Sequence, residues 1–415
     1  MNVLLHTFGC KANQYDTAVV RQRLEAAGCR IVDSPGEADA AVVNSCTVTH
    51  VSETKLRGFV RRLARRRPGL RTVVMGCAAT LDDGRLAALP GVAAVIAGAD
   101  AGAVAEALGL APPAPEALRG FPGQGRAWLK VQDGCDEHCT FCATVLARGA
   151  GRSREAGALV AEAALLAERH PEIVLTGVHV GTYGADLAGG WTLGRLAGLL
   201  IERVPDVRFR LGSVEATEGD DALVSLMAGV PERLAPHVHA PLQSGSDAVL
   251  RRMGRHWYSA ASYAARVEAI AARVAPLGLG ADVMTGFPGE TAADHQATLD
   301  LLRCLPFTYL HVFPYSPREG TAAPHLGAPP APEVVRERGA ELRALAAERE
   351  AAHRRAREGQ VADLVVEGRR GGCHEAVSED YLGVRIPTDA AWVAGRRRVR
   401  ARLVGAGDGL AAEAA

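Results

Sequence analysis

Three cysteines share one short segment, GCDEHCTFC, in which Cys135, Cys139 and Cys142 are separated by three and then two residues. Thiolates at this spacing can hold three corners of a cubane iron-sulfur cluster and leave the fourth iron open to a small chelating molecule. The alternative is a structural zinc site, but zinc requires four closed ligands and the only extra ligand nearby, His138, lies inside the segment. The spacing therefore favours an iron-sulfur cluster, and we call these three residues the loop set.

Three further cysteines each follow a short apolar run that reads as a buried strand. Cys10 follows VLLHTFG, Cys46 follows AVVNS and Cys77 follows TVVMG. The carboxyl ends of parallel strands line a common crevice, so these thiols, the strand-end set, are predicted to meet and hold a second cluster. The alternative is that each is a small buried hydrophobe. That interpretation is kept for the cysteines without such a placement, Cys29, Cys304 and Cys373.

The elements that must position the strand-end set form an alternating pattern in the first part of the chain. Strands are predicted at 3–7, 40–43, 72–75 and 92–96, and helices at 16–27, 51–67 and 84–89. This alternation predicts an α/β domain with a doubly wound parallel sheet, placed at residues 1–112. The Pro/Ala-rich stretch 111–122 is interpreted as a linker.

A second alternation positions the loop set. Strands are predicted at 128–131, 173–176, 207–211, 238–242, 279–285 and 309–313, with five helical stretches between them. This pattern predicts a central partial (β/α)6 barrel over residues 121–350, with the loop set at the mouth where barrel enzymes keep their chemistry. A solvated helix is predicted at 332–358. Short alternating strands at 361–366, 382–386 and 398–404 then predict a small C-terminal β-barrel at 355–415.

Polar residues and glycines follow the predicted barrel strands and could contact a nucleoside cofactor. The candidates are Gly177, Glu215, Gln243, Asp282 and Gly286. Each of them alone could instead be a turn residue or a helix cap. The histidines of this region are interpreted as satisfied core or rim groups rather than metal ligands; they are His179, His237, His239 and His311.

Two arginine clusters indicate a nucleic-acid partner. The first lies on the predicted helix 51–67, in a stretch without acidic residues, and comprises Arg57, Arg61, Arg62, Arg65 and Arg66. The second is predicted on one face of the last strand and comprises Arg396, Arg398, Arg400 and Arg402. A phosphate backbone is the expected partner of both clusters. The alternative is a salt-bridged surface that faces the acidic residues of helix 332–358.

The loop set, with Phe141 just before its last cysteine, resembles the signature of the radical S-adenosylmethionine superfamily. A three-cysteine N-terminal domain, a barrel and a terminal β-module similar to a TRAM domain together resemble the methylthiotransferase family. The resemblance implies that the loop set is catalytic and holds a 4Fe-4S cluster that binds S-adenosylmethionine. It also implies that the strand-end set holds a second 4Fe-4S cluster, which supplies or relays sulfur.

The segments FGCKANQYDT, NSCTVTHVS and HVFPYSPREGT resemble the threonylcarbamoyladenosine branch of that family. They predict a methylthio transfer to the 2-position of N6-threonylcarbamoyladenosine next to the tRNA anticodon. Lys11 and Arg148 are candidates for pairing with the substrate carboxylate. The run from Ala143 to Ala147 departs from the family, which usually has Pro and an aromatic residue there.

Three alternatives to this function remain at the level of sequence. They are an isopentenyladenosine tRNA methylthiotransferase, a ribosomal-protein aspartate methylthiotransferase, and a non-catalytic RNA-binding protein stabilised by zinc. Analysis of iron and acid-labile sulfide after anaerobic purification separates the third alternative from the others, because a zinc protein would contain neither in quantity.

The composition limits the cellular compartment and the kinds of partner that we expect. The chain has 415 residues, 48% of them hydrophobic, and its 47 basic residues balance its 47 acidic ones. Nine cysteines are too few for a disulfide scaffold in a chain of this size. No run approaches the roughly 18 apolar residues that span a bilayer. We expect a cytoplasmic monomer without membrane contact, whose partners are the tRNA anticodon loop and an external electron donor.

Overall fold

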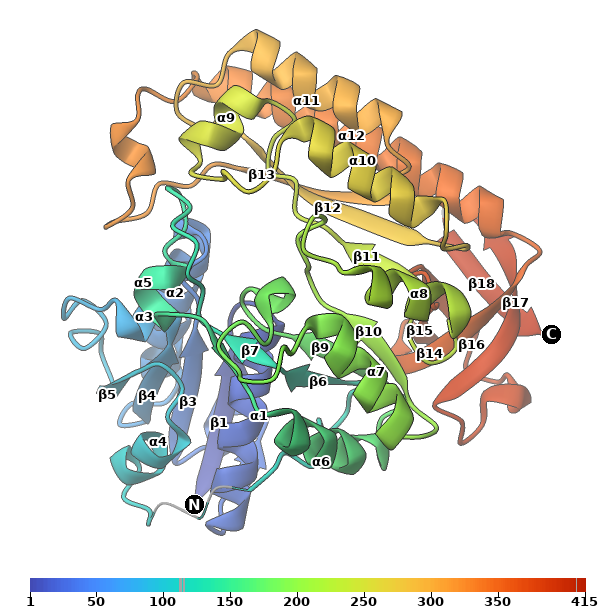
Figure 1. The fold of residues 1–415 in the computed structure, drawn as a ribbon. Coiled ribbons are helices and arrows are strands. Elements are labelled where there is room, and N and C mark those ends of the chain that lie inside the picture. Colours follow the sequence, from blue (N-terminus) through green and yellow to red (C-terminus); the bar gives the residue numbers. More distant parts are fainter. Residues whose placement is uncertain (112–113, 115, 408) are drawn as a thin grey trace. The chain divides into compact units, whose positions relative to one another are not determined.

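The computed structural model describes residues 1–111, 114, 116–407 and 409–415 (Figure 1). The linker predicted at 111–122 falls partly outside the described residues, at 112, 113 and 115. The chain divides into two compact units. The first comprises Met1–Arg119, Gln132–Arg152 and Ser316–Thr321, and the second comprises Gly120–Val131, Ser153–Tyr315 and Ala322–Ala415.

The first unit is built on a parallel sheet with the strand order β2-β1-β3-β4-β5. The strands are β1 (Asn2–Thr7), β2 (Arg30–Val32), β3 (Ala40–Ser45), β4 (Arg71–Gly76) and β5 (Val92–Ala97). The helices around it are α1 (Lys11–Ala26), α2 (His50–Arg66), α3 (Cys77–Thr80) and α4 (Ala101–Ala107). The remaining elements of the unit are η1 (Pro35–Glu37), β7 (Gln132–Asp133) and α5 (Thr144–Arg148).

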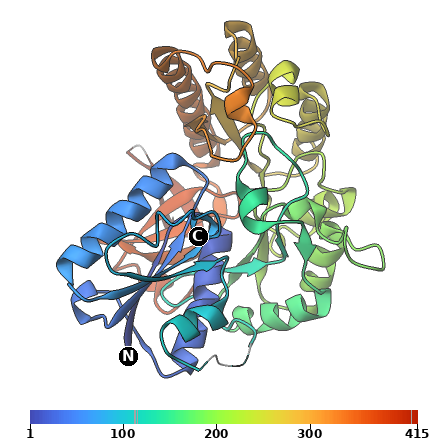
Figure 2. The same ribbon diagram turned by 90° about the vertical axis from the view of Figure 1, so that its left-hand side faces the viewer.

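Both faces of this sheet are covered, as Figures 1 and 2 show for the blue and cyan part of the chain. Successive strand residues point to opposite faces. Accordingly Val42 and Val73 pack in one core cluster with α1 and α4, while Val43 and Val74 pack in another with α2. The doubly wound parallel sheet is therefore confirmed.

The helix predicted at 84–89 is wrong, because this segment forms turns. Gly84 has a φ of 98°, outside the helical region. The carboxylate of Asp82 accepts hydrogen bonds from the backbone N–H groups of Leu86 at 2.8 Å and Ala87 at 3.4 Å. An aspartate side chain that takes these donors stabilises a turn in place of a helix.

The second unit contains six parallel strands that follow one another in chain order. One sheet has the order β10-β9-β6 and the other the order β11-β12-β13. Parallel bridges join the two sheets at Phe209–Leu234 and Ser213–His239. The strands are β6 (Arg126–Lys130), β9 (Glu172–Thr176), β10 (Arg208–Leu211), β11 (His237–His239), β12 (Gly278–Thr285) and β13 (Tyr309–Pro314). The partial six-stranded β/α barrel is thus confirmed.

Helices connect the barrel strands. They are α6 (Ala156–Ala167), α7 (Leu193–Arg203), α8 (Asp221–Gly229), α9 (Asp247–Arg252), α10 (Ala260–Ala271) and α11 (Ala292–Cys304). The long helix α12 (Pro332–Arg357) follows and packs against β13. None of the helices in the described part of the chain combines the length and the apolar composition needed to cross a membrane.

The C-terminal strands close into a small barrel with the order β14-β15-β16-β18-β17. They are β14 (Val361–Arg370), β15 (Cys373–Val377), β16 (Gly383–Pro387), β17 (Arg398–Ala406) and β18 (Gly409–Ala414). The predicted β-module is confirmed, but β15 and β18 were missed. The sequence GLAAEA of β18 has low β-propensity and forms a strand because β16 and β17 supply its partners. The strand that carries the arginines is therefore not the last one.

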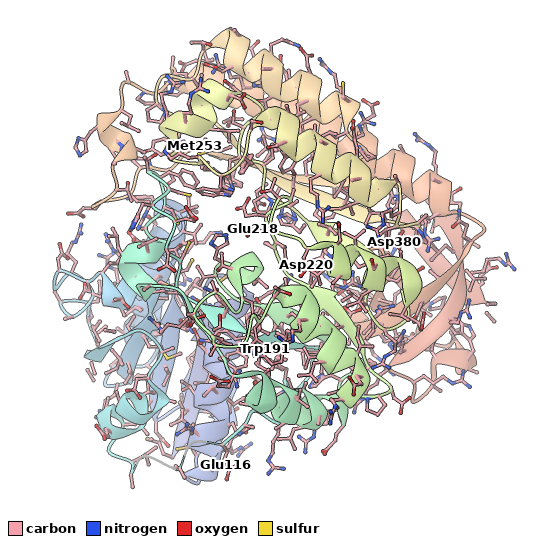
Figure 3. The ribbon with its side chains drawn as sticks, viewed as in Figure 1. Glu116, Trp191, Glu218, Asp220, Met253 and Asp380 are labelled. Carbon is pink, nitrogen blue, oxygen red and sulfur yellow. The ribbon has the colours of Figure 1, made fainter. Side chains whose placement is uncertain are left out.

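Buried charges join the C-terminal barrel to the rest of the second unit. Glu172 of β9 is fully buried and is paired with Arg208 and Arg210 of β10, whose side chains are also fully buried. Arg210 also donates hydrogen bonds to the carbonyl oxygens of Ser378 and Glu379. A second link is Asp380, which is labelled in Figure 3. Its carboxylate lies 3.0 Å from Nε2 of His353 and 2.9 Å from Nε of Arg357, both on α12.

Candidate active site

The strand-end set comes together at one edge of the sheet of the first unit. Cys10 precedes α1, Cys46 follows β3 and Cys77 begins α3, at the carboxyl ends of three adjacent strands. The side-chain oxygen of Asn13 lies 3.9 Å from the sulfur of Cys10 and 3.8 Å from that of Cys77. A Cβ on Gly9 would lie only 3.0 Å from the sulfur of Cys46. The close packing at Gly9 therefore requires a residue without a side chain.

The protonation of these thiols depends on their burial. Burial raises the pKa of Cys46 to about 11, and the neighbouring Cys10 and Cys77 add to the rise. Burial also raises the pKa of Cys77, although Arg148 opposes it. Metal binding requires thiolates, so a metal centre at this edge must displace protons as it forms.

Arg148 is the main cation of this site and is held by four side chains of the first unit. Its Nε donates to the sulfur of Cys77 at 3.2 Å. Its Nη1 donates to both carboxylate oxygens of Asp133 at 2.9 and 3.1 Å, and its Nη2 donates to Asn13 at 2.6 Å and Asp16 at 3.0 Å. Burial opposes the charge, but Asp16, Cys77 and Asp133 together raise the pKa of Arg148. The guanidinium that was a candidate for the substrate carboxylate is thus already engaged by the protein.

The loop set lies between β7 and α5 in a loop whose path depends on a glycine. Gly134 has a φ of 74°, and a Cβ there would lie 1.9 Å from the carbonyl oxygen of Ala150. The N–H of Cys135 donates to the carbonyl of Gly149 at 3.0 Å, so the start and the end of the loop are joined. This hydrogen bond therefore folds the loop back on itself.

Backbone donors point at two of the three sulfurs of the loop set. The N–H of Glu137 lies 3.4 Å from the sulfur of Cys135, and the N–H of Thr144 lies 3.4 Å from the sulfur of Cys142. Such hydrogen bonds to cysteine sulfur tune iron-sulfur clusters. The residues present therefore fit a cluster held by this loop.

A zinc site brings its sulfur ligands close together. Sulfurs around a tetrahedral zinc, with bonds of roughly 2.3 Å, would lie about 3.8 Å apart. In the described part of the chain only one group of three histidines or acids brings its ligating atoms within 4.8 Å of one another, and neither cysteine set does. Metal analysis of the purified protein decides between zinc and iron at these cysteines.

The run that departs from the family pattern forms the helix α5. Leu146 is exposed and Ala147 is buried within it. Gly149 ends the helix with a φ of 71°, and Arg148 therefore lies in the last helical position, directed to the strand-end set. The missing proline thus does not prevent this segment from reaching the cysteines.

Arg318 was missed by the sequence reasoning, although it lies in the quoted segment HVFPYSPREGT. It belongs to the first unit, where its side chain donates to the hydroxyl of Thr47 at 2.8 Å and pairs with Glu53. Thr47 directly follows Cys46, so Arg318 holds the chain beside one cysteine of the strand-end set. Only the tertiary structure brings a residue 271 positions away to this place.

The cofactor candidates of the second unit lie at or after barrel strands, and their contact with a cofactor stays a prediction. Gly177 directly follows β9. Glu215 is buried beside Arg255; burial raises the pKa of this carboxyl, and Arg255 opposes the rise. Gln243 has a φ of 65° and forms a parallel bridge to Val283.

The remaining two candidates have internal partners. The N–H of Gly286 donates to the carboxylate of Glu290 at 2.8 Å, which makes this segment a tight turn. Asp282 lies next to His239 and His311, at 3.1 and 3.3 Å. Of the other two histidines singled out in the sequence, His179 pairs with Glu218, which Figure 3 labels, and His237 contacts Tyr309.

The first arginine cluster lies on the outer side of α2. Leu56, Val60 and Leu63 are buried, and they face the sheet. We call the exposed residues Arg61, Arg62, Arg65 and Arg66 the basic face of α2. Arg57 is half-buried and lies 3.8 Å from Glu53. RNA binding by these residues stays a prediction.

The second cluster is divided by the structure. Arg400 and Arg402 are exposed on β17, while Arg396 precedes that strand. Arg398 is paired with Asp363 and donates to the carbonyl of Glu232 at 2.7 Å. Its partner is thus a residue of β14, not the acidic residues of α12.

The partial barrel of parallel strands, with three cysteines in the loop after its first strand, defines the class of radical S-adenosylmethionine enzymes. Residues 129–302 match the radical SAM superfamily, and residues 2–98 match the uncharacterized protein family UPF0004. The solved structure of the radical S-adenosylmethionine methyltransferase TsrM from Kitasatospora setae has a similar fold. It aligns with a TM-score of 0.57 at 15% identity, over 75% of this chain and 72% of that one.

Named relatives narrow the class. The chain is 36% identical to the threonylcarbamoyladenosine tRNA methylthiotransferase MtaB of Thermotoga maritima, over 77% of this chain and 76% of that protein. It is 33% identical to the tRNA-2-methylthio-N(6)-dimethylallyladenosine synthase of a Parafrankia species, over 88% of this chain and 78% of that protein. The chain belongs to the methylthiotransferase family of radical S-adenosylmethionine enzymes, and the resemblance seen in the sequence is confirmed.

Proposed function

We propose that this chain is a tRNA methylthiotransferase that adds a methylthio group at the 2-position of N6-threonylcarbamoyladenosine next to the anticodon. It uses two 4Fe-4S clusters and S-adenosylmethionine, takes electrons from an external donor, and acts in the cytoplasm as a monomer. The observation that carries the proposal is the pair of separate cysteine sets within a chain of this family. Both sets have surroundings suited to iron-sulfur ligation.

The two cysteine sets have different proposed roles. The loop set would hold the cluster that binds S-adenosylmethionine, and the strand-end set would hold the second cluster. When bound, these groups supply hydrogen abstraction at the target carbon and the sulfur and methyl group that are transferred. The protein contributes deprotonated thiolates, backbone N–H donors to sulfur, and the guanidinium of Arg148 beside Cys77.

Exposed arginines are proposed to bind the phosphate backbone of the tRNA. The apolar side of α2 packs against the sheet, and the basic face of α2 is exposed, where it can contact a phosphate backbone. Arg400 and Arg402 on the small barrel, which resembles a TRAM domain, are the second contact. Several exposed arginines lie next to one another, and such a concentration of positive charge favours phosphate binding over a salt-bridged surface.

The choice of nucleoside rests on the segments FGCKANQYDT and NSCTVTHVS and on relatives named for threonylcarbamoyladenosine at 34–36% identity. The second candidate is dimethylallyladenosine, since relatives named for it align over 88–90% of this chain at 32–33% identity. Mass spectrometry of tRNA nucleosides from a deletion strain decides between them. Loss of the methylthio-threonylcarbamoyl nucleoside is expected, and loss of the dimethylallyl product instead would contradict the assignment.

The number of clusters is tested by iron and sulfide analysis after anaerobic purification. Two 4Fe-4S clusters correspond to about eight irons per chain. Replacing the loop set by Ala leaves about half the iron and abolishes cleavage of S-adenosylmethionine. Replacing the strand-end set also leaves about half the iron but retains cleavage. The matched control is the triple replacement of Cys29, Cys304 and Cys373, which lie outside both sets and leave the iron content unchanged. A strand-end variant with full iron would refute the second cluster.

A further inference from the structure

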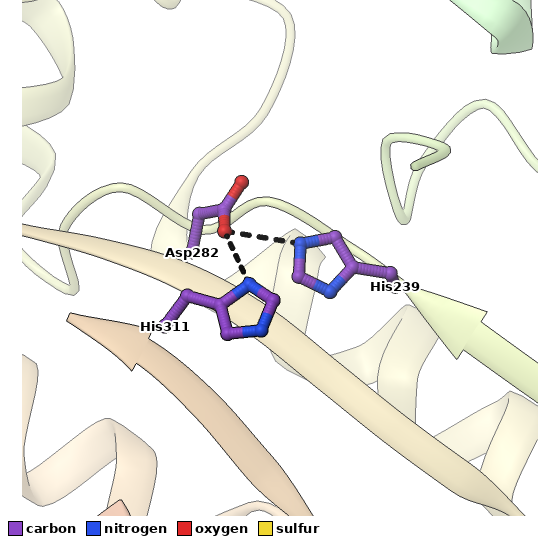
Figure 4. A group of neighbouring side chains, drawn as sticks. All are labelled: His239, Asp282 and His311. Carbon is purple, nitrogen blue, oxygen red and sulfur yellow. Dashed lines mark hydrogen bonds and ion pairs between the residues drawn. The ribbon is translucent and has the colours of Figure 1, made fainter. Parts of the chain in front are cut away.

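Three side chains of the second unit converge from neighbouring strands (Figure 4). They are His239 at the end of β11, Asp282 in β12 and His311 in β13. One carboxylate oxygen of Asp282 lies 3.1 Å from Nε2 of His239 and 3.3 Å from Nδ1 of His311. Within the residues that the structure describes, this is the group of three possible metal ligands whose atoms all lie within 4.8 Å of one another.

The arrangement differs from the other histidine–carboxylate pairs of the second unit. His295 meets Glu341 at 2.7 Å, and His353 meets Asp380 at 3.0 Å, each as one imidazole against one carboxylate. At Asp282 the same oxygen faces two imidazole nitrogens. Two imidazoles and a carboxylate that point at one small volume form a ligand set for a transition metal.

The surroundings fix the orientation of His239. Its Nδ1 lies 3.0 Å from the hydroxyl of Tyr309, which also lies 2.8 Å from Nε2 of His237. Tyr309 occupies space that is open only because residue 280 is glycine, where a Cβ would lie 2.0 Å from Cζ of the tyrosine. A hydrogen bond to the second ring nitrogen is what orients a metal-binding histidine, and it leaves Nε2 of His239 directed at Asp282.

The distances suit a metal ion without a large rearrangement. With ligand bonds of roughly 2.0–2.1 Å, ligand atoms lie about 3.3 Å apart around a tetrahedral ion and about 3.0 Å apart at adjacent octahedral positions. The two observed separations, 3.1 and 3.3 Å, fall in this range. The side chain of His311 is 61% exposed while that of His239 is 9% exposed, so an ion can enter from the His311 side.

The charge of the site is also suitable. Asp282 offers a carboxylate, which opposes the charge of a cation, and His239 and His311 offer imidazole nitrogens; transition metals accept both kinds of ligand. A metal would replace the two histidine contacts with direct bonds to all three groups.

We propose that His239, Asp282 and His311 form a binding site for a single divalent transition metal, such as Zn²⁺ or Fe²⁺, that is separate from both cysteine sets. Three protein ligands leave at least one coordination position for water or for an oxygen donor of a bound molecule. This role replaces the cofactor contact predicted for Asp282 and the interpretation of His239 and His311 as merely satisfied groups. The site does not depend on which nucleoside the enzyme modifies.

The test uses the full-length protein with its cysteines occupied by reconstituted clusters. The protein is treated with a chelator that spares the clusters and then dialysed anaerobically against micromolar Zn²⁺. Elemental analysis is expected to give about one zinc per chain, and X-ray absorption at the zinc edge a shell of nitrogen and oxygen at about 2.0–2.1 Å. A sulfur shell at about 2.3 Å, or no retained zinc, would overturn the proposal.

Variants assign the ligands. His311→Gln is the first choice, because the exposed side chain can be replaced with little risk to the fold; it is expected to weaken zinc binding more than tenfold. Tyr309→Phe removes the orienting hydroxyl and should weaken binding about 10- to 100-fold. His295→Gln is the matched control, since it breaks a histidine–carboxylate pair outside the site and should leave zinc binding unchanged. Equal zinc binding by His311→Gln and the wild type contradicts the site. The cluster content and modified nucleoside are measured separately, so a failure here is distinguishable from a failure of the proposed function.

Discussion

Replacement of Arg148 by Gln is expected to destabilise the first unit and to lower the reduction potential of the cluster proposed for the strand-end set. The side chain of Arg148 is 10% exposed and its partner Asp16 is 4% exposed. Gln keeps most of the volume of the side chain but removes the positive charge. The buried carboxylate of Asp16 then loses its ion pair with Arg148, and Cys77 loses a charged hydrogen-bond donor.

The size of both effects follows from the contacts. Removing one partner of a buried ion pair costs about 3–5 kcal/mol. In a unit of this size each kcal/mol lowers the unfolding temperature by roughly 2–4 °C, so the expected decrease is about 6–20 °C. A hydrogen bond from a charged donor contributes about 1.5–3 kcal/mol, which for a one-electron couple corresponds to at most about 65–130 mV. The positive guanidinium favours the more negative, reduced cluster, so its removal shifts the potential to more negative values.

The assay is a potentiometric titration followed by electron paramagnetic resonance, in protein whose loop set has been replaced by Ala so that only one cluster contributes. Arg148→Lys keeps the charge without the planar fork, and is expected to lose stability while retaining most of the potential. Arg152→Gln is the matched control, because this nearby arginine is exposed and donates hydrogen bonds to the carbonyls of Ala150 and Arg148 rather than to a carboxylate or thiol of the site. An unchanged potential in Arg148→Gln, or equal shifts in the Gln and Lys variants, would refute the electrostatic reasoning.

Further outcomes are expected from the other charged groups. Glu172→Gln leaves Arg208 and Arg210 buried without their carboxylate, and should destabilise the second unit by about 3–5 kcal/mol in thermal unfolding. Exposed Glu202→Gln, the control, should change it by less than about 0.5 kcal/mol. Burial raises the pKa of Glu172 but the two arginines outweigh it and lower this pKa. The stabilisation by Glu172 is therefore complete at neutral pH and is lost as the pH falls below about 4.5 towards the folded-state pKa, so the difference between wild type and Glu172→Gln should shrink in acid. Replacing the basic face of α2 by Ser should weaken tRNA binding and reduce its salt slope by about 0.7–0.9 per lost phosphate contact. The matched control replaces four exposed arginines elsewhere, Arg203, Arg303, Arg336 and Arg370, and an equal loss of affinity there would contradict a specific role for α2.

The sequence by itself determined the elements whose signals are local. The loop set is a short spacing within one segment, and the strand-end set follows three apolar runs, so both could be recognised from neighbouring residues. The alternation of strands and helices predicted the parallel sheet and the partial barrel for the same reason. It failed at 84–89, where Asp82 and Gly84 favour a turn, and at β18, whose alanines form a strand only because β16 and β17 flank it.

The tertiary structure decided which distant side chains meet. Arg148 reaches Asp16 across 132 positions, and Arg318 reaches Thr47 across 271. Asp282 receives His239 and His311 because β11, β12 and β13 are hydrogen-bonded in a register that brings these side chains together. Spacing along the chain carries no signal for such contacts, since the register of strands is fixed by packing across the whole sheet. For that reason the sequence singled out the two cysteine sets, whereas Arg148 beside Cys77 and the group of His239, Asp282 and His311 became visible only in the folded chain.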